Sequence, residues 1–218
     1  MRNALVITAF CFCLISCSSA QECKEGLNLL PMYGNIPKCD EQLKMDKDFI
    51  SSTTSQFPNR KTASIALVDK AWGHFYKGDL ETSMKRFNQA WLLDSLNADV
   101  YWGFGNLLGK KGEFKTSISY FEKSLKIDPN NAKVYEGIAT SYGQLFFETK
   151  ERGLLDKSIT ALYRANGIDK NNPRILSQLT AAYSYFMQKD SAYKYLKLTD
   201  KIDPKTIHPE VRAMLTKK

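Results

Sequence analysis

The sequence predicts an all-α protein built as a solenoid of about four stacked helical hairpins, with an N-terminal extension and a C-terminal capping helix. Three observations predict this fold class. First, the chain carries one pattern in four successive segments, 64–97, 98–131, 132–172 and 173–206. Second, small and aromatic residues recur within each segment at helical spacing. Third, Ile-Asp-Pro closes two of the segments, at 127–129 and 202–204, and proline disfavours helical conformation in the residue before it.

Composition places the chain among globular proteins. It has 218 residues, 31 Lys plus Arg, 23 Asp plus Glu and 43% hydrophobic residues. These values exclude a wholly disordered chain and a polytopic membrane protein. With only His74 and His208, we expect no histidine metal cluster and no cofactor. The formal charge of +8 has its excess toward the C-terminus. We interpret that excess as a solvated surface, and no basic stripe with stacking aromatics predicts nucleic-acid binding.

The first residues are typical of an export signal. Arg2 precedes an apolar run from Ala4 to Ile15, which is too short for a permanent transmembrane helix and fits a secretory signal peptide. The segment Leu14-Ile15-Ser16-Cys17 resembles the lipobox of bacterial lipoproteins. The resemblance implies removal of residues 1–16 and lipidation of Cys17, and the serines that follow Cys17 favour the outer membrane, facing the periplasm. The alternative is an ordinary signal peptide that is cut after Ala20.

Residues 17–63 form an extension before the repeats. It retains two cysteines, Cys23 and Cys39, and an even pair in an exported chain favours a disulfide; two free thiols are the alternative. Residues 21–37 show no helical period, whereas 40–57 predict a helix that packs on the first repeat through Leu43, Ile50 and Phe57. The apolar residues of 29–33 favour a segment laid against the repeats.

The clearest copy of the pattern is 98–131. Its residues at the patterned positions are Tyr101, Phe104, Gly105, Leu108, Gly112, Phe114, Ser117, Phe121, Ser124, Leu125 and Pro129. This pattern resembles the tetratricopeptide repeat, a helical hairpin in which small residues stand where the two helices cross closely. One hairpin does not bury its own apolar face, so neighbours stack. The resemblance implies a right-handed superhelix. The third copy departs from it, because it exceeds the period around Gln144 to Arg152.

Residues 207–218 predict the cap that such an array needs at its end. Val211, Met214 and Leu215 share one helix face, and Pro209 suits a first helical turn.

The resemblance implies a concave surface, lined by the first helix of each hairpin, that binds a partner protein or peptide. The residues it places there include Trp72, Phe75, Tyr76, Trp102, Asn106, Lys110, Glu136 and Arg174. Aromatic anchors beside polar residues are typical of binding hot spots. The alternative is that the extension covers the aromatic residues within the same chain. Some members of this family clamp the C-terminal tails of chaperones with a Lys and an Asn. Val68 and Trp72 occupy these two positions here, which excludes chaperone-tail binding of that kind.

No enzyme is predicted. The motifs of serine hydrolases, zinc proteases, P-loop and dinucleotide-binding proteins are missing from the sequence. His74 stands at an aromatic position of the first repeat, without an acidic or cysteine cluster, and we interpret it as a packing residue. We therefore predict a lipid-anchored adaptor or scaffold that helps to assemble an outer-membrane machine. The alternative is an immunity or inhibitor protein that binds one toxin or hydrolase.

Overall fold

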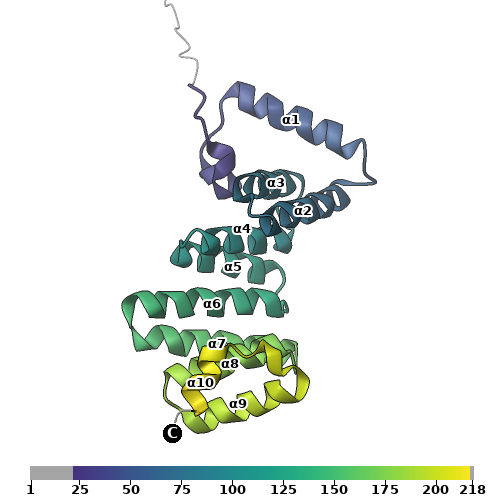
Figure 1. The fold of residues 1–218 in the computed structure, drawn as a ribbon. Coiled ribbons are helices and arrows are strands. Elements are labelled where there is room, and N and C mark those ends of the chain that lie inside the picture. Colours follow the sequence, from purple (N-terminus) through teal and green to yellow (C-terminus); the bar gives the residue numbers. More distant parts are fainter. Residues whose placement is uncertain (1–21, 217–218) are drawn as a thin grey trace, which may run out of the picture.

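The computed structural model describes residues 22–216, which form ten α-helices and three short 3-10 helices. The predicted signal segment 1–16 and the lipidation site Cys17 lie outside the described residues. Figure 1 shows the helices in chain order. The 3-10 helices are η1 (Leu27–Leu29), η2 (Pro31–Asn35) and η3 (Pro204–Thr206). The α-helices are α1 (Asp40–Thr54), α2 (Arg60–Tyr76), α3 (Leu80–Leu93), α4 (Ala98–Lys110), α5 (Phe114–Ile127), α6 (Ala132–Thr149), α7 (Arg152–Ile168), α8 (Pro173–Tyr185), α9 (Lys189–Ile202) and α10 (Pro209–Thr216).

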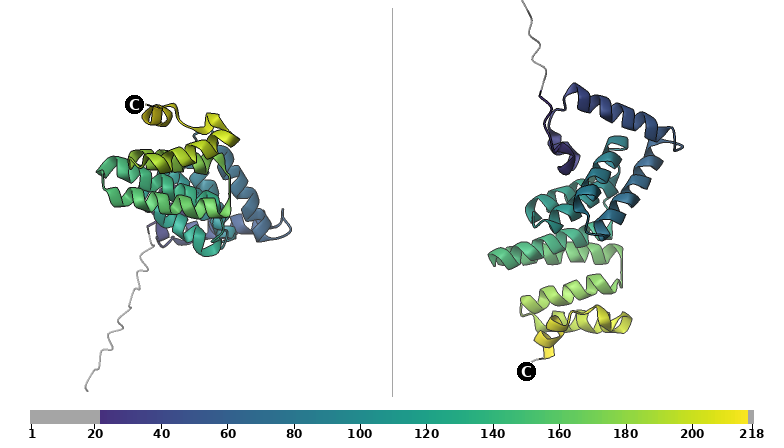
Figure 2. Two further views of the ribbon diagram at one scale, coloured as in Figure 1. Left: turned by 90° about the horizontal axis from the view of Figure 1, so that it is seen from below. Right: turned by 45° about the horizontal axis from the view of Figure 1, so that its top comes forward.

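Helices α2 to α9 pack as four successive hairpins, α2 with α3, α4 with α5, α6 with α7 and α8 with α9. Each hairpin also contacts the next one, which makes a solenoid (Figures 1 and 2). The predicted all-α fold class is confirmed. Helix α2 begins at Arg60, four residues before the predicted start of the first repeat at Ser64, because Asn59 accepts a hydrogen bond from the Thr62 amide and so caps the helix there.

Local sequence signals define the turns. Gly78 and Gly112 join the helices of the first two hairpins in the left-handed backbone region, at φ of 79° and 82°, which glycine adopts without steric cost. Lys150 and Met187 take the corresponding positions at φ of 61° and 59°. Between hairpins, an asparagine oxygen accepts the backbone hydrogen bond that opens the next helix. These asparagines are Asn97, Asn131 and Asn172.

The crossing of helices within and between hairpins depends on residues that have no bulky side chain. Phe121 of α5 is 2% exposed and lies between Gly105 of α4 and Gly137 of α6. A Cβ atom on either glycine would lie 2.5 Å from the ring of Phe121. Serine hydroxyls on the second helices bond back to carbonyls of the first helices at 2.7–2.9 Å, in the pairs Ser83–Ala71, Ser117–Gly105 and Ser158–Ala139.

The N-terminal extension lies against the first hairpin (Figure 1). Its 3-10 helices contact α3, and the buried amide of Asn88 on α3 donates hydrogen bonds of 2.9 Å to the carbonyls of Asn28 and Leu30. A disulfide joins Cys23 and Cys39. Helix α1 has no buried residue. It ends at Thr54, so Phe57 follows the helix instead of lying in it. Of the three expected contact residues, Ile50 and Phe57 are partly buried against the core of the first hairpins. Leu43 is 43% exposed.

Helix α10 covers the last hairpin. Val211 and Leu215 are buried against the core that α6 to α9 share. Arg212 forms hydrogen bonds of 2.6 and 3.1 Å with both carboxylate oxygens of Asp200 on α9. The guanidinium holds the pKa of the Asp200 carboxyl below its usual value, mainly through these hydrogen bonds. Within residues 22–216, no helix is long and apolar enough to span a bilayer.

The glycine contacts of Phe121 predict opposite effects for two alanine substitutions. Gly105→Ala places a methyl group against a buried ring that Gly137 confines from the other side, so we expect a loss of about 1–3 kcal/mol in the free energy of unfolding. Gly73→Ala, in α2, meets no atom within 4 Å and is expected to add about 0.5–1 kcal/mol. Urea unfolding followed by circular dichroism measures both. Equal stability changes for the two variants would contradict the proposed role of Gly105.

Candidate functional site

One side of the solenoid is a groove along its first helices. We call α2, α4, α6 and α8 the groove helices. A first hollow of about 370 Å³ lies between α2, α4 and α6, and a second of about 320 Å³ lies between α6 and α8. Both hollows are lined by Thr140 and Gln144 of α6, so they lie next to each other on the two sides of these residues. The predicted residues Phe75, Asn106 and Lys110 line the first hollow.

Missing side chains make the groove deep. Gly109 and Gly143 occupy corresponding positions on α4 and α6 and line the first and second hollows respectively. Serine hydroxyls lie beneath them: a Cβ on Gly109 would lie 3.3 Å from Ser117 Oγ. The Ser117 hydroxyl bonds the Gly105 carbonyl and also lies 3.1 Å from Ser141 Oγ. Because these polar groups are already satisfied within the protein, the groove floor offers shape and apolar contact more than free hydrogen-bonding groups.

Aromatic residues of α2 and α4, the first two groove helices, cluster at one end of the groove. The Trp72 ring centre lies 5.1 Å from Phe75, 5.8 Å from Tyr76 and 4.3 Å from Trp102. Trp72 also packs edge-on against buried Phe87 at 5.4 Å, so it supports the core. Tyr76 is 76% exposed, which means that the extension does not cover it. The aromatic contact of the extension is instead between Tyr33 and Trp91 of α3.

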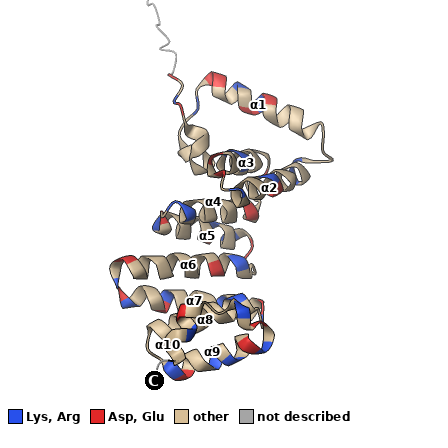
Figure 3. Cartoon of the chain, in the orientation of Figure 1, with Lys and Arg blue, Asp and Glu red and all other residues tan. Residues whose placement is uncertain are grey.

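Polar side chains of α4 lie at the edge of the groove. Asn106 donates a hydrogen bond of 2.8 Å to the Trp102 carbonyl; its side-chain oxygen accepts no hydrogen bond from the described residues. Lys110 is exposed, at the last turn of α4. Charged residues of α4 and α6 lie toward the ends of these helices, which leaves the middle of both uncharged (Figure 3).

Glu136 and Arg174 connect α6 to α8. Arg174 Nη2 lies 2.6 Å from Glu136 Oε2, and the side chains are 63% and 7% exposed respectively. Burial raises the pKa of the Glu136 carboxyl, and the Arg174 charge and hydrogen bond oppose that rise. The pair joins two neighbouring repeats, so the carboxylate that the sequence places on the concave surface is held by its own chain.

Sequence reasoning missed Phe147. The residues that exceed the repeat period extend α6 to Thr149, and this brings Phe147 onto the edge of the second hollow. There its ring packs edge-on against Tyr185 of α8, with centres 4.9 Å apart. The surplus around Gln144 to Arg152 was the signal, but its length alone does not tell whether the residues lengthen a helix or a loop.

Groups of acidic, histidine and cysteine side chains suited to a metal ion are missing from residues 22–216. His74 Nδ1 lies 3.0 Å from Asp79 Oδ2. Asp79 caps α3 by accepting a hydrogen bond from the Thr82 amide. This hydrogen bond is the main reason why the pKa of the Asp79 carboxyl is lowered. His74, in the last turn of α2, thus contacts the residue that caps α3.

Comparison with known proteins agrees with the geometry. Residues 98–131 match the family described as the tetratricopeptide repeat. Among solved structures, PilF of Pseudomonas aeruginosa is 19% identical, with 72% of this chain and 67% of that chain covered and a TM-score of 0.60. MamA is 18% identical, with coverage of 76% and 94% and a TM-score of 0.56. YrrB, described as a TPR protein with an unusual peptide-binding site, is 21% identical, with coverage of 70% and 74% and a TM-score of 0.54. No curated protein sequence matches the chain.

The Glu136–Arg174 pair predicts a pH-dependent stability difference. Arg174→Ala leaves a buried carboxyl without its partner and raises its pKa further. In the folded variant the pKa of Glu136 then exceeds its unfolded value by a wider margin. The variant therefore keeps its stability below the ordinary glutamate pKa, about 4.3, and loses stability as the pH rises through the folded pKa. We expect a loss of about 1 kcal/mol at neutral pH, since the arginine is exposed, and a smaller loss near pH 4.

Urea unfolding at the two pH values measures this difference, and Glu136→Gln supplies the control. In the Glu136→Gln background, Arg174→Ala is expected to change stability little at either pH. An Arg174→Ala effect that is independent of pH in the otherwise wild-type chain would show that Glu136 is not the group responsible.

Proposed function

Because residues 98–131 form a tetratricopeptide repeat and the chain has the fold of such interaction scaffolds, we propose that this protein is a lipid-anchored adaptor of the bacterial envelope. In this proposal the groove binds an extended segment of a partner protein. The single observation that supports it best is that the two hollows lie next to each other at Thr140 and Gln144. Together they involve all four groove helices, an arrangement that suits an extended peptide better than a small molecule.

The groove is suited to hold such a segment with little rearrangement. Its floor is fixed by half-buried glycines and by serine hydroxyls whose hydrogen bonds are internal, so binding requires little ordering of the scaffold, which favours affinity. The hollows accept apolar side chains. Lys110 is exposed at the edge of the first hollow and supplies a cationic contact. Exposed Tyr76 packs against Phe75, which lines that hollow, with ring centres 5.7 Å apart, and supplies an aromatic contact nearby.

The location in the envelope rests on the N-terminal sequence. Leu14 to Cys17 resembles a lipobox, and several acyl chains on one residue give stable anchoring, whereas a single chain is marginal. Cys17 stands only six residues before Cys23 of the extension, so the array would lie close to the membrane that holds the lipid. Assembly of an outer-membrane machine is the role that suits a rigid scaffold held there.

Partner capture tests the groove. We expect the combined exposed substitutions Tyr76→Ser, Lys110→Gln and Gln144→Ala to lower partner capture at least about tenfold, because hot-spot contacts each contribute on the order of 2 kcal/mol. Envelope crosslinking, affinity capture and quantitative mass spectrometry measure it. The matched control carries Lys115→Gln, Thr116→Ala and Glu122→Gln on the exposed face of α5. Undiminished capture by the groove variant would contradict the proposal, and one stoichiometric lytic partner would favour an inhibitor.

Lipid labelling tests the anchor. Wild-type protein is expected to incorporate an alkyne fatty acid and to sediment with the membranes, because Cys17 is the only thiol in the lipobox segment. Cys17→Ser removes the lipidated atom, so it should abolish the label, whereas Ser18→Ala should retain it. Labelling and fractionation of cells that express each variant measure this. Cleavage after Ala20 in the wild-type chain would instead identify an ordinary signal peptide.

A further inference from the structure

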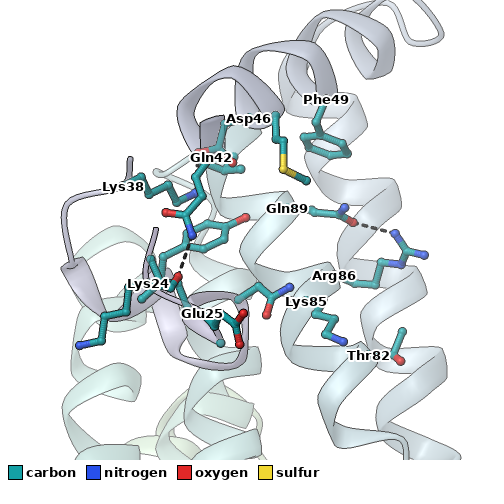
Figure 4. Close-up of a pocket in the computed structure, with 16 residues that line it drawn as sticks. Lys24, Glu25, Lys38, Gln42, Asp46, Phe49, Thr82, Lys85, Arg86 and Gln89 are labelled. Atoms are coloured by element: carbon teal, nitrogen blue, oxygen red, sulfur yellow. Dashed lines mark hydrogen bonds and ion pairs between the residues drawn. The ribbon is translucent and has the colours of Figure 1, made fainter. Parts of the chain in front are cut away.

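A separate cavity lies between segment 24–38 of the N-terminal extension, helix α1 of the same extension, and α3 (Figure 4). Its volume is about 380 Å³, within the range of small-ligand pockets. It shares no lining residue with the groove. The polar side chains labelled in Figure 4 come from all three parts, with Lys24 from segment 24–38, Gln42 from α1 and Lys85 from α3 among them.

The cavity lining carries uncompensated positive charge. Lys38 and Asp46 form an ion pair and neutralise each other. The remaining charged residues of the lining are Lys24, Lys85 and Arg86 against Glu25. None of these four forms an ion pair within the described chain; Arg86 instead donates a hydrogen bond of 2.7 Å to the Gln89 side-chain oxygen. The lining therefore has an excess of cations that a negatively charged ligand would balance.

The wall formed by the extension is held in an unusual conformation. Met32, Tyr33 and Asn35 have φ of 54–55°, and Gly34 lies between them at 69°. Non-glycine residues rarely adopt this left-handed region, and such strained segments concentrate at functional sites. The turn brings Tyr33 to the cavity, where the Lys38 Nζ atom lies 3.1 Å from the ring centre.

Tyr33 presents a neutral donor to the cavity. Burial raises the pKa of its hydroxyl, and the Asp46 charge adds to that rise. No hydrogen bond from this hydroxyl is formed within the described chain. It therefore joins Lys85 and Arg86 as a group able to bind an anionic head.

Part of the lining is apolar. Met45 and Phe49 of α1, Leu27 of η1 and Leu92 of α3 line the cavity. Helix α1 has no buried residue, and Met45 is 65% exposed. An apolar body placed beneath α1 would remove this surface from water, which is favourable in proportion to the apolar area covered.

We propose that this cavity binds a small organic anion with an apolar body. The head lies against Lys85, Arg86 and the Tyr33 hydroxyl, and the body packs against Met45 and Phe49 beneath α1. The proposal does not depend on peptide binding in the groove, so either site can fail its test without affecting the other.

Fluorescence titration of the full chain with anilinonaphthalene sulfonate, an anion on an aromatic body, tests the proposal. We expect saturable binding with one probe per chain. Lys85→Gln with Arg86→Gln should weaken binding about tenfold, since hydrogen bonds to charged groups are the strong ones. The matched control is Lys194→Gln with Lys197→Gln on α9, which makes the same charge change far from the cavity and should alter affinity less than twofold. Equal weakening by both pairs would overturn the proposal.

Two further measurements separate head from body. Phenylnaphthylamine has a similar apolar body without the sulfonate, and its affinity should not change with Lys85→Gln and Arg86→Gln. Octanoate should displace the sulfonate probe, whereas acetate and octanol at the same concentration should not. Displacement by octanol as effective as by octanoate would overturn the anionic part of the proposal. Thermal unfolding followed by circular dichroism checks that each variant is folded.

The source of the anion is distinguished by a last comparison. Vesicles of phosphatidylglycerol and vesicles of phosphatidylcholine are tested as competitors beside free octanoate. If the phosphatidylglycerol vesicles displace the probe and the phosphatidylcholine vesicles do not, the head group is assigned to a membrane lipid. Displacement by octanoate and by neither vesicle would assign it to a free amphiphile. Failure of all three to displace the probe would overturn the proposal.

Discussion

The close crossing of helices around Phe121 is the constraint on which the array depends. Phe121 fills the space between α4 and α6 only because Gly105 and Gly137 have no side chain there. The same close approach lets the Ser117 hydroxyl reach the Gly105 carbonyl. A larger residue at either glycine would separate the helix axes, and every later hairpin would be displaced with them. The stacking geometry is therefore set by a few positions, while the exposed faces of the helices remain free to vary.

The groove follows directly from that stacking. When α4 and α6 lie close and parallel, Gly109 and Gly143 leave hollows between their neighbours. The two ends then differ in what they offer. Trp72 contributes both to the core and to the aromatic cluster, so that end is fixed by packing. Phe147 and Tyr185 form an edge that only the lengthened α6 makes possible. For the proposed partner segment, a rigid floor with two chemically different ends would favour one direction of binding over the other.

The sequence predicts the hairpins well because their signals are local and repeated in phase. Asn97, Asn131 and the glycine turns mark helix ends by their own chemistry. The site is predicted less completely. Phe147 depends on how a surplus of residues is divided between helix and loop, which no local signal decides. The left-handed turn around Tyr33 is harder still, since residues other than glycine adopt it only when the surrounding structure compensates its cost of about 1–2 kcal/mol per residue.

The two ends of the array are closed in different ways, and this explains why the extension leaves a cavity. At the C-terminal end, Val211 and Leu215 of α10 join the core directly. At the other end, α1 has no buried residue. Its start is held instead by the Cys23–Cys39 disulfide, and by a hydrogen bond of 2.7 Å from Gln42 to the Lys24 carbonyl. Polar and covalent links fix the position of a helix without requiring that the space beneath it be filled. An end closed in this way can keep a cavity such as the one of about 380 Å³ that α1 and α3 line.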